Sequence, residues 1–171
     1  DFRESEKQPI AVVFHINHDE NTEGNGYAVY LWDLEPLAFA DSIGVKQNTS
    51  ADIAALDGFE NTFALLDARE TSSPLAEKVF DMWRYGQSAY VPSVAQMRLL
   101  YHAKEQINPV IKMCGGDTLS VEADDCWYWT STEVNEQQTA KAWLYSMGSG
   151  TIHDTPKIQA HKSRAIITLR D

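Results

Sequence analysis

The stretch Trp127–Thr132, WYWTST, decides how the C-terminal part of this chain folds. It is built from aromatic residues and from Thr and Ser, and such a run is typical of a β-strand. The same character returns in Ala140–Met147 and Thr151–Asp154, with the turn Gly148-Ser149-Gly150 between them, and again in Ser163–Leu169. These segments predict a set of strands joined by short turns at the C-terminal end.

A second pair of strand-like runs lies near the N-terminus. Ile10–Ile16 and Tyr27–Leu34 are rich in β-branched and aromatic residues, and the polar segment His18–Gly26 separates them as a hairpin loop would. In the second run both faces carry apolar side chains, so we expect both to be covered. Strands at both chain ends with helices between them predict an α+β fold, in which the N-terminal strand lies near the C-terminal one.

Two main helices are predicted in the middle of the chain. Ser73 can accept hydrogen bonds from free N–H groups at the start of one helix, with Pro74 at its first position and Gly86 as its stop. Ser93 and Gln96 can form a capping box for the other. Shorter helical segments are predicted at Ala51–Leu56, at Asn61–Leu66 and from Asn108-Pro109 to Gly115-Gly116.

Length and composition favour one domain, residues 9–171, preceded by a charged and unpatterned segment, residues 1–8, that we expect to be flexible. A chain of 171 residues with 43% hydrophobic composition can bury roughly 70% of its unfolded surface in one core. Its formal charge of −11 opposes binding to nucleic acids or to anionic membranes. The apolar runs are far shorter than the ~20 residues of a spanning helix, so the chain as given is not expected to span a membrane.

Several motifs follow one another in an order that resembles a family of bacterial surface domains. They are Pro9–Phe14 (PIAVVF), Ala89–Ser93 (AYVPS), Tyr128–Glu133 (YWTSTE) and Ala142-Trp143. The family is the Lcl C-terminal-like family, also called the Fibrobacter succinogenes major paralogous domain, and the resemblance covers nearly the whole chain. It implies a C-type-lectin-like fold, within the fold group that also holds the formylglycine-generating enzymes.

The resemblance implies a secreted or surface-anchored bacterial domain whose signal or anchor segment has been removed. We expect a non-enzymatic binding or adhesion module for a glycan or a host or surface protein, with no cofactor and no catalytic residues. The alternatives are an enzyme of the formylglycine-generating group and a structural subunit of a surface fibre. Whether a calcium ion is bound stays open, because Asp117, Asp124 and Asp125 could supply oxygen ligands but form no EF-hand or lectin calcium motif.

The two cysteines, Cys114 and Cys126, flank a short loop. They could form a local disulfide in an oxidising compartment, which the implied export favours, or remain as two buried thiols. A formylglycine-type oxidase would also need a pair of cysteines, but near the end of the fold rather than beside this loop. We therefore expect a structural disulfide between Cys114 and Cys126.

No metal or hydrolase motif is present in the sequence. The five histidines show no HExxH spacing, and neither CxxC nor GxSxG occurs. The acidic run Glu122–Asp125 is most simply a solvated loop rather than an acid–base pair. We therefore predict neither a catalytic nor a transition-metal site.

Aromatic side chains are the remaining candidates for ligand binding. An aromatic face can stack on the apolar face of a sugar, but aromatic residues also fill cores. We expect Trp129 and Trp143 to be core residues, and we select Tyr90, Trp127 and Tyr145 as candidate ligand-binding residues. The family's association with sulfated glycans would require a basic patch on this acidic chain, for which the candidates are Lys157, Lys162, Arg164 and Arg170.

Overall fold

The computed structural model describes residues 9–18, 24–85 and 88–170, and within them the chain has a mixed α+β fold with antiparallel sheets. The predicted flexible segment, residues 1–8, and the predicted helix stop at Gly86 lie outside the described residues. In chain order the elements are β1 (Ala11–Ile16), β2 (Gly26–Tyr30), β3 (Leu34–Ala38), α1 (Gly58–Asp67), α2 (Pro74–Phe80), the 3₁₀ helix η2 (Asp81–Tyr85), α3 (Val94–Met113), β4 (Trp127–Glu133), β5 (Lys141–Ser146), β6 (Ile152–Pro156), β7 (Ala160–Ser163) and β8 (Ile166–Leu169).

One sheet joins the two ends of the chain. Its strand order is β1-β2-β8, so the N-terminal hairpin pairs with the C-terminal strand as expected, through β2 rather than β1. Every residue of β2 is buried, because the strand is central and both of its faces are covered. The predicted hairpin of the first two strands is confirmed, with a register shift between Val13 and His15.

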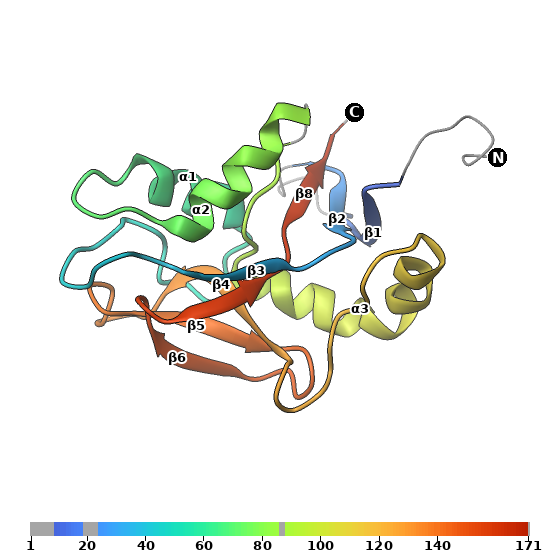
Figure 1. Cartoon of the computed structure of the whole chain (residues 1–171). Helices are drawn as coiled ribbons and strands as arrows, with labels where there is room; N and C mark the ends of the chain where they lie inside the picture. Colours follow the sequence, from blue (N-terminus) through green and yellow to red (C-terminus); the bar gives the residue numbers. More distant parts are fainter. Residues whose placement is uncertain (1–8, 19–23, 86–87, 171) are drawn as a thin grey trace.

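The first three C-terminal runs are strands, as predicted, and they form a second sheet of order β4-β5-β6. The fourth run, Ser163–Leu169, contains the end of β7 and the strand β8, which pairs with β2 instead. A separate two-stranded sheet, β3 with β7, was not predicted. Its strands read LEPLA and AHKS, which lack the run of β-branched and aromatic residues that marks the others. In Figure 1, α1 and α2 lie above β3, and the β4-β5-β6 sheet lies below it. The β3–β7 pair therefore runs between the helices and that sheet, with β7 packed against β4.

The predicted starts of both main helices are confirmed. Ser73 accepts a hydrogen bond from the Ala76 N–H at the start of α2, with Pro74 at the first helical position. Ser93 and Gln96 form the full capping box of α3. The short helix predicted at Asn61–Leu66 is part of α1, whereas the one predicted at Ala51–Leu56 is wrong, because that segment forms only loop and turn.

The separate helix predicted from Asn108-Pro109 is also wrong, because α3 continues through Pro109 to Met113. Asn108 uses its side chain instead to bind both backbone groups of Leu119, which pins the following loop to the helix. The glycine pair does end α3: Gly115 has a φ of +82°, and Gly116 N–H donates to the Ile111 carbonyl. This is the Schellman arrangement, which needs a residue free to adopt positive φ.

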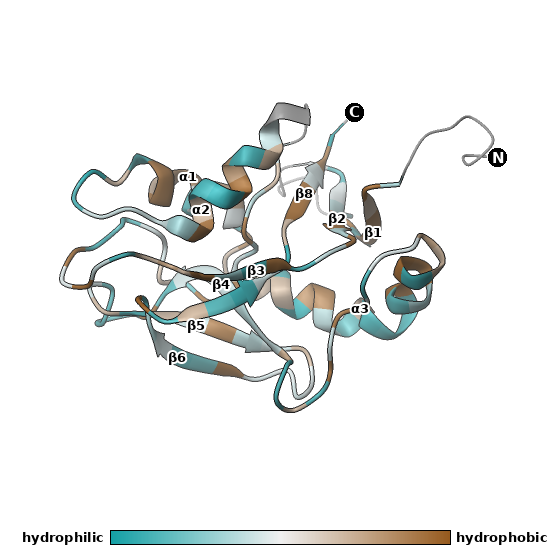
Figure 2. Ribbon diagram, viewed as in Figure 1, coloured by the Kyte–Doolittle hydropathy of each residue, from teal (hydrophilic) through white to brown (hydrophobic). Residues whose placement is uncertain are grey.

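Two hydrophobic clusters form the interior. One contains Trp129, Phe39 and the buried side chains of α1 and α2, and the other lies between α3 and the faces of β2 and β5. Trp129 is buried as expected, but it packs against Phe39 and donates its Nε1 hydrogen to the Leu37 carbonyl of β3, not beneath α3. Figure 2 shows that most of β6 and β7 is hydrophilic.

Candidate ligand-binding pocket

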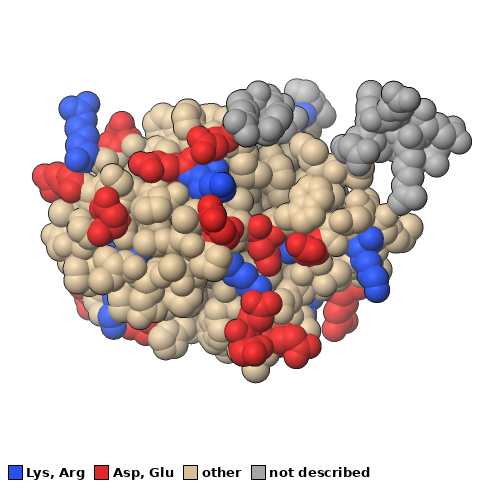
Figure 3. All heavy atoms as spheres, viewed as in Figure 1, with Lys and Arg blue, Asp and Glu red and all other residues tan. Residues whose placement is uncertain are grey.

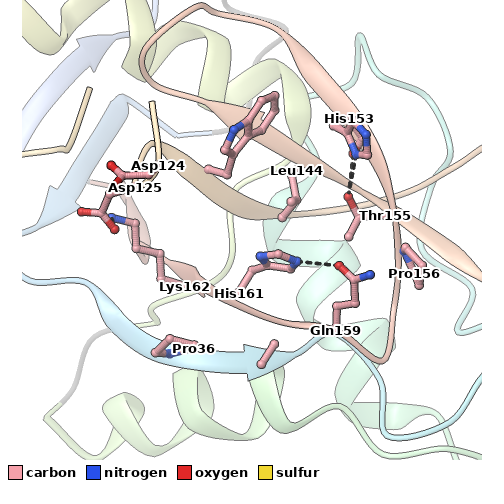
Figure 4. Close-up of a pocket in the computed structure, with 12 residues that line it drawn as sticks. Pro36, Asp124, Asp125, Leu144, His153, Thr155, Pro156, Gln159, His161 and Lys162 are labelled. Carbon is pink, nitrogen blue, oxygen red and sulfur yellow. Dashed lines mark hydrogen bonds and ion pairs between the residues drawn. The ribbon is translucent and has the colours of Figure 1, made fainter. Parts of the chain in front are cut away.

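An open pocket of about 500 Å³ lies where β6 and β7 meet the beginning of β4. Its walls come from the acidic loop before β4, from the turn that joins β6 to β7, and from Pro36 of β3 (Figure 4). Leu144 of β5 lies at its base. The pocket thus combines segments that are distant in sequence and meet only in the folded chain.

Trp127 supplies the aromatic surface of the pocket. It is the first residue of β4 and points to the same face as Trp129, two positions later, because strand side chains alternate. Trp129 is fully buried, whereas Trp127 is half-buried, packs on the first cluster and lines the pocket. The His153 ring lies edge-on to Trp127, with centroids 6.0 Å apart and an interplanar angle of 72°.

Side chains that can form hydrogen bonds lie beside this aromatic surface. His153 Nδ1 lies 3.2 Å from Thr155 Oγ1 on β6, and His161 Nε2 lies 3.0 Å from Gln159 Oε1 (Figure 4). His161 also packs edge-on against Trp129, with centroids 5.3 Å apart. Burial, with a smaller contribution from His153, lowers the pKa of His161 below its usual 6.5, so its imidazole is neutral at pH 7.

The charged rim of the pocket is internally paired. Lys162 Nζ lies 2.9 Å from Asp125 Oδ1 and 3.5 Å from Asp33 Oδ2, and it sits over the Tyr128 ring. The hydrogen bond and charge of Lys162 lower the pKa of the Asp125 carboxyl. Residues 122–125 are all exposed, as predicted for a solvated loop, although Asp125 forms an ion pair with Lys162 and Asp124 and Asp125 line the pocket.

Two of the three predicted ligand-binding residues are wrongly placed for that role. Tyr90 and Tyr145 are each 1% exposed, so neither offers a ring face for stacking. Tyr90 pairs its backbone with Ile166, and its hydroxyl contacts Thr168 and Gln96, while burial raises its pKa. Tyr145 faces the second cluster. Only Trp127 of the predicted set lines the pocket.

Sequence reasoning missed the polar residues of the pocket. His153 and Thr155 stand two positions apart and share one face of β6, and Gln159 and His161 repeat that spacing around β7. This i, i+2 pattern of polar residues was the available signal, but it also describes any solvated strand face.

The candidate basic patch is not present. Lys157 and Arg164 are fully buried in ion pairs with Glu133 and Asp33, and Lys162 is committed to Asp125. Arg170 lines a different, much smaller cavity. On the face shown in Figure 3, acidic side chains outnumber the basic ones and surround them.

The predicted disulfide is also absent, since Cys114 and Cys126 are both free thiols. Cys114 caps the C-terminal end of α3 and packs against the second cluster. Cys126 is buried beside β5, where its Sγ lies 3.2 Å from Ser146 Oγ. The two thiols thus belong to different local environments, and the predicted structural disulfide is not formed.

A comparison with protein-family models gave no match, and a comparison with curated proteins gave none. None of the helices in the described part of the chain combines the length and apolar composition needed to cross a membrane. In residues 9–18, 24–85 and 88–170, no three His, Cys, Asp or Glu side chains gather in a group that could hold a metal ion.

Proposed function

We propose that this chain is a non-enzymatic, secreted or surface-anchored bacterial binding domain, and that it binds neutral glycans at the Trp127 pocket. The order of the sequence motifs supports its placement beside the Lcl C-terminal-like family and in the C-type-lectin-like fold group. The observation that carries the proposal is the partly exposed Trp127 ring in an open pocket that also presents the uncharged hydrogen-bonding groups of Thr155 and Gln159. A sugar has the same two sides, an apolar C–H face and a rim of hydroxyls.

The chemistry of the pocket favours an uncharged ligand. His161 is neutral at pH 7, and Gln159 and Thr155 can each donate and accept hydrogen bonds, as sugar hydroxyls require. Lys162 already has two carboxylate partners, so a sulfate would have to displace them. The chain's charge of −11 raises the cost of approach for any anion.

A glycan array tests this proposal. The parent protein should bind neutral sugars at low and at high salt, because aromatic stacking and neutral hydrogen bonds are little screened. Trp127→Ala should lose the signal, whereas Trp32→Ala, which removes a half-exposed Trp that does not line the pocket, should keep it. Binding to sulfated chains that vanishes with salt and survives in Trp127→Ala would overturn the proposal.

A structural subunit of a surface fibre is the second candidate, and β1 favours it. This strand is at the edge of its sheet, and Val13 and Ile16 are each about half exposed. An apolar edge strand can pair with the edge of a second copy. Sedimentation of the parent and of Val13→Lys over a range of concentrations separates the two candidates: assembly abolished by the lysine would favour the fibre, and a monomer throughout would exclude it.

A further inference from the structure

A buried polar cluster lies behind the pocket, in the turn that follows β6. Lys157 Nζ lies 2.6 Å from Glu133 Oε2 and 3.1 Å from Gln47 Oε1, and all three residues are 0% exposed. Thr49 holds the other carboxylate oxygen, Glu133 Oε1, through its hydroxyl at 2.7 Å and its backbone N–H at 3.0 Å. Glu133 is the last residue of the family-like motif, and Gln47 comes from the loop before α1.

If the cluster served only to stabilise the fold, its hydrogen bonding would be incomplete. Gln47 Nε2 is buried and has no hydrogen-bond partner within the described part of the chain, which costs about 1–3 kcal/mol for a desolvated polar group. A buried ion pair also rarely repays the desolvation of its two charges. The arrangement combines an amine, a carboxylate and a side-chain amide whose nitrogen makes no hydrogen bond within the described part of the chain.

We propose that Lys157 and Gln47 become joined by an intramolecular isopeptide bond, with Glu133 as the acid–base group. Glu133 takes a proton from Nζ, and the free amine attacks the side-chain carbonyl carbon of Gln47. The new N–C bond forms as the bond from that carbon to Nε2 breaks. Nζ gives up a second proton to Glu133, which passes one proton to the departing nitrogen and keeps the other. Ammonia leaves, and no oxidant or other reactant is consumed.

The surroundings favour each step. Burial lowers the pKa of Lys157, although Glu133 opposes the shift, and a lower pKa makes the neutral amine easier to reach. Thr49 fixes the carboxylate so that Glu133 Oε2 faces the amine. Backbone hydrogen bonds from Lys157 N–H to Ala140 and from Ala40 N–H to the Lys157 carbonyl hold the reacting lysine in place. Fixed reactants in a dry site gain a large effective concentration.

The bond would fasten the loop before α1 to the turn between β6 and β7, residues 110 apart in sequence. Gln159 lies in that turn and His161 in β7, so the link would brace one wall of the pocket from behind. The inference does not rest on glycan binding, because it is drawn from a buried cluster that no ligand could reach.

Mass spectrometry of the intact parent protein, after incubation in the folded state, tests the proposal. The expected mass is lower than that of the sequence by one ammonia. Since a succinimide at Asn25-Gly26 would give the same loss, the site must be read from a tryptic digest. Linked chains block cleavage at Lys157, so the peptide 47–69 should appear joined to the peptide 142–162.

Two variants complete the experiment. Glu133→Gln keeps the shape but cannot take the proton, and we expect the full sequence mass and no joined peptides. Lys141→Arg changes a surface lysine that pairs with Asp154, and it should keep the ammonia loss. A parent that shows the full mass and separate peptides 47–69 and 158–162 overturns the proposal, whatever the variants do. Joined peptides in Glu133→Gln would instead remove Glu133 from the chemistry.

Discussion

The motif on β4 and the pocket beside it are adjacent in space but are specified in the sequence in different ways. Residues 128–133 form one uninterrupted run that is recognisable by eye, and every one of them is buried. The pocket contains Trp127, one residue earlier, together with Asp124 and Asp125 of the preceding loop, and its other polar groups come from residues 153–162, more than twenty positions later. The recognisable run thus maintains the fold, whereas the surface that can touch a ligand has no signature.

The contacts of the motif explain why its residue types are so constrained. Trp129 donates to the backbone of β3, Thr130 to the Trp143 carbonyl of β5, and Thr132 accepts from the Val94 N–H at the start of α3. One strand therefore fixes the positions of three other elements. A buried side chain with a directional hydrogen bond tolerates few replacements, whereas pocket residues are free to vary with the ligand.

Trp129→Ala should lower the free energy of unfolding more than any other change considered. A smaller effect would contradict the contrast between a buried motif and an exposed pocket. Removing this fully buried side chain leaves a cavity against Phe39 and an unbound Leu37 carbonyl, at a cost of about 3–5 kcal/mol in the free energy of unfolding. Denaturant unfolding measures it. Trp32→Ala, half exposed, should stay within about 0.5 kcal/mol of the parent. Equal stability of both variants would mean that the motif is not the core.

Thr132→Val tests the directional part of the same argument. Valine fills nearly the same volume but cannot accept the hydrogen bond from Val94 N–H, which then stays unpaired in a buried position. The expected loss is about 1–3 kcal/mol, smaller than for Trp129 because no cavity forms. Hydrogen exchange of the first turn of α3 should accelerate at the same time. Unchanged exchange in that turn would show that water or another group replaces Thr132.

Trp127→Ala tests the pocket in the same way, by asking whether this residue contributes to ligand binding rather than to stability. Because the ring is only half-buried, stability should fall by about 1 kcal/mol or less, while affinity for a neutral sugar should fall about tenfold, the value of one aromatic contact. Thermal melts and glycan titrations of the same preparation report both quantities. A large loss of stability with intact binding would place Trp127 with the motif rather than with the pocket.

Elements that depend on local sequence signals were predicted well. Elements that depend on pairing between distant segments were missed. The capping box of Ser93 and the Gly115-Gly116 stop are short-range chemistry and were found correctly. β3 and β7 were missed because Glu35-Pro36 and the polar run 160–163 have little strand propensity of their own. They form strands only by pairing with each other. Propensity alone does not contain that information.

The candidate site was harder to predict than the fold for a related reason. Alternation assigns Tyr145 to a face of β5 but does not say which face another element covers, and here the second cluster under α3 buries it. Trp127 was identified as an aromatic residue of β4 that lies outside the family-like motif. The pocket residues His153 and His161 were not identified, since β6 and β7, which carry them, meet Trp127 only through the pairing of β4, β5 and β6 and the contact of β7 with β4.

The smallest expected effect is a dependence of stability on pH to which His161 of the pocket contributes. His161 has its pKa lowered by burial first and by the nearby His153 second, so the unfolded chain binds more protons than the folded one just below pH 6.5. The stabilisation from the neutral imidazole is complete above the unfolded pKa of 6.5 and is lost as pH falls toward the lowered folded pKa. The free energy of unfolding should therefore decline between pH 7 and about pH 5, a window in which ordinary carboxylates stay ionised.

His161→Gln should flatten this decline without abolishing it, because burial lowers the pKa of His15 as well. An NMR titration of the parent gives the site directly. A pKa for His161 at or above 6.5 would mean that the ring is solvated rather than packed on Trp129, and the proposed preference for uncharged sugars would then lose one of the observations that support it.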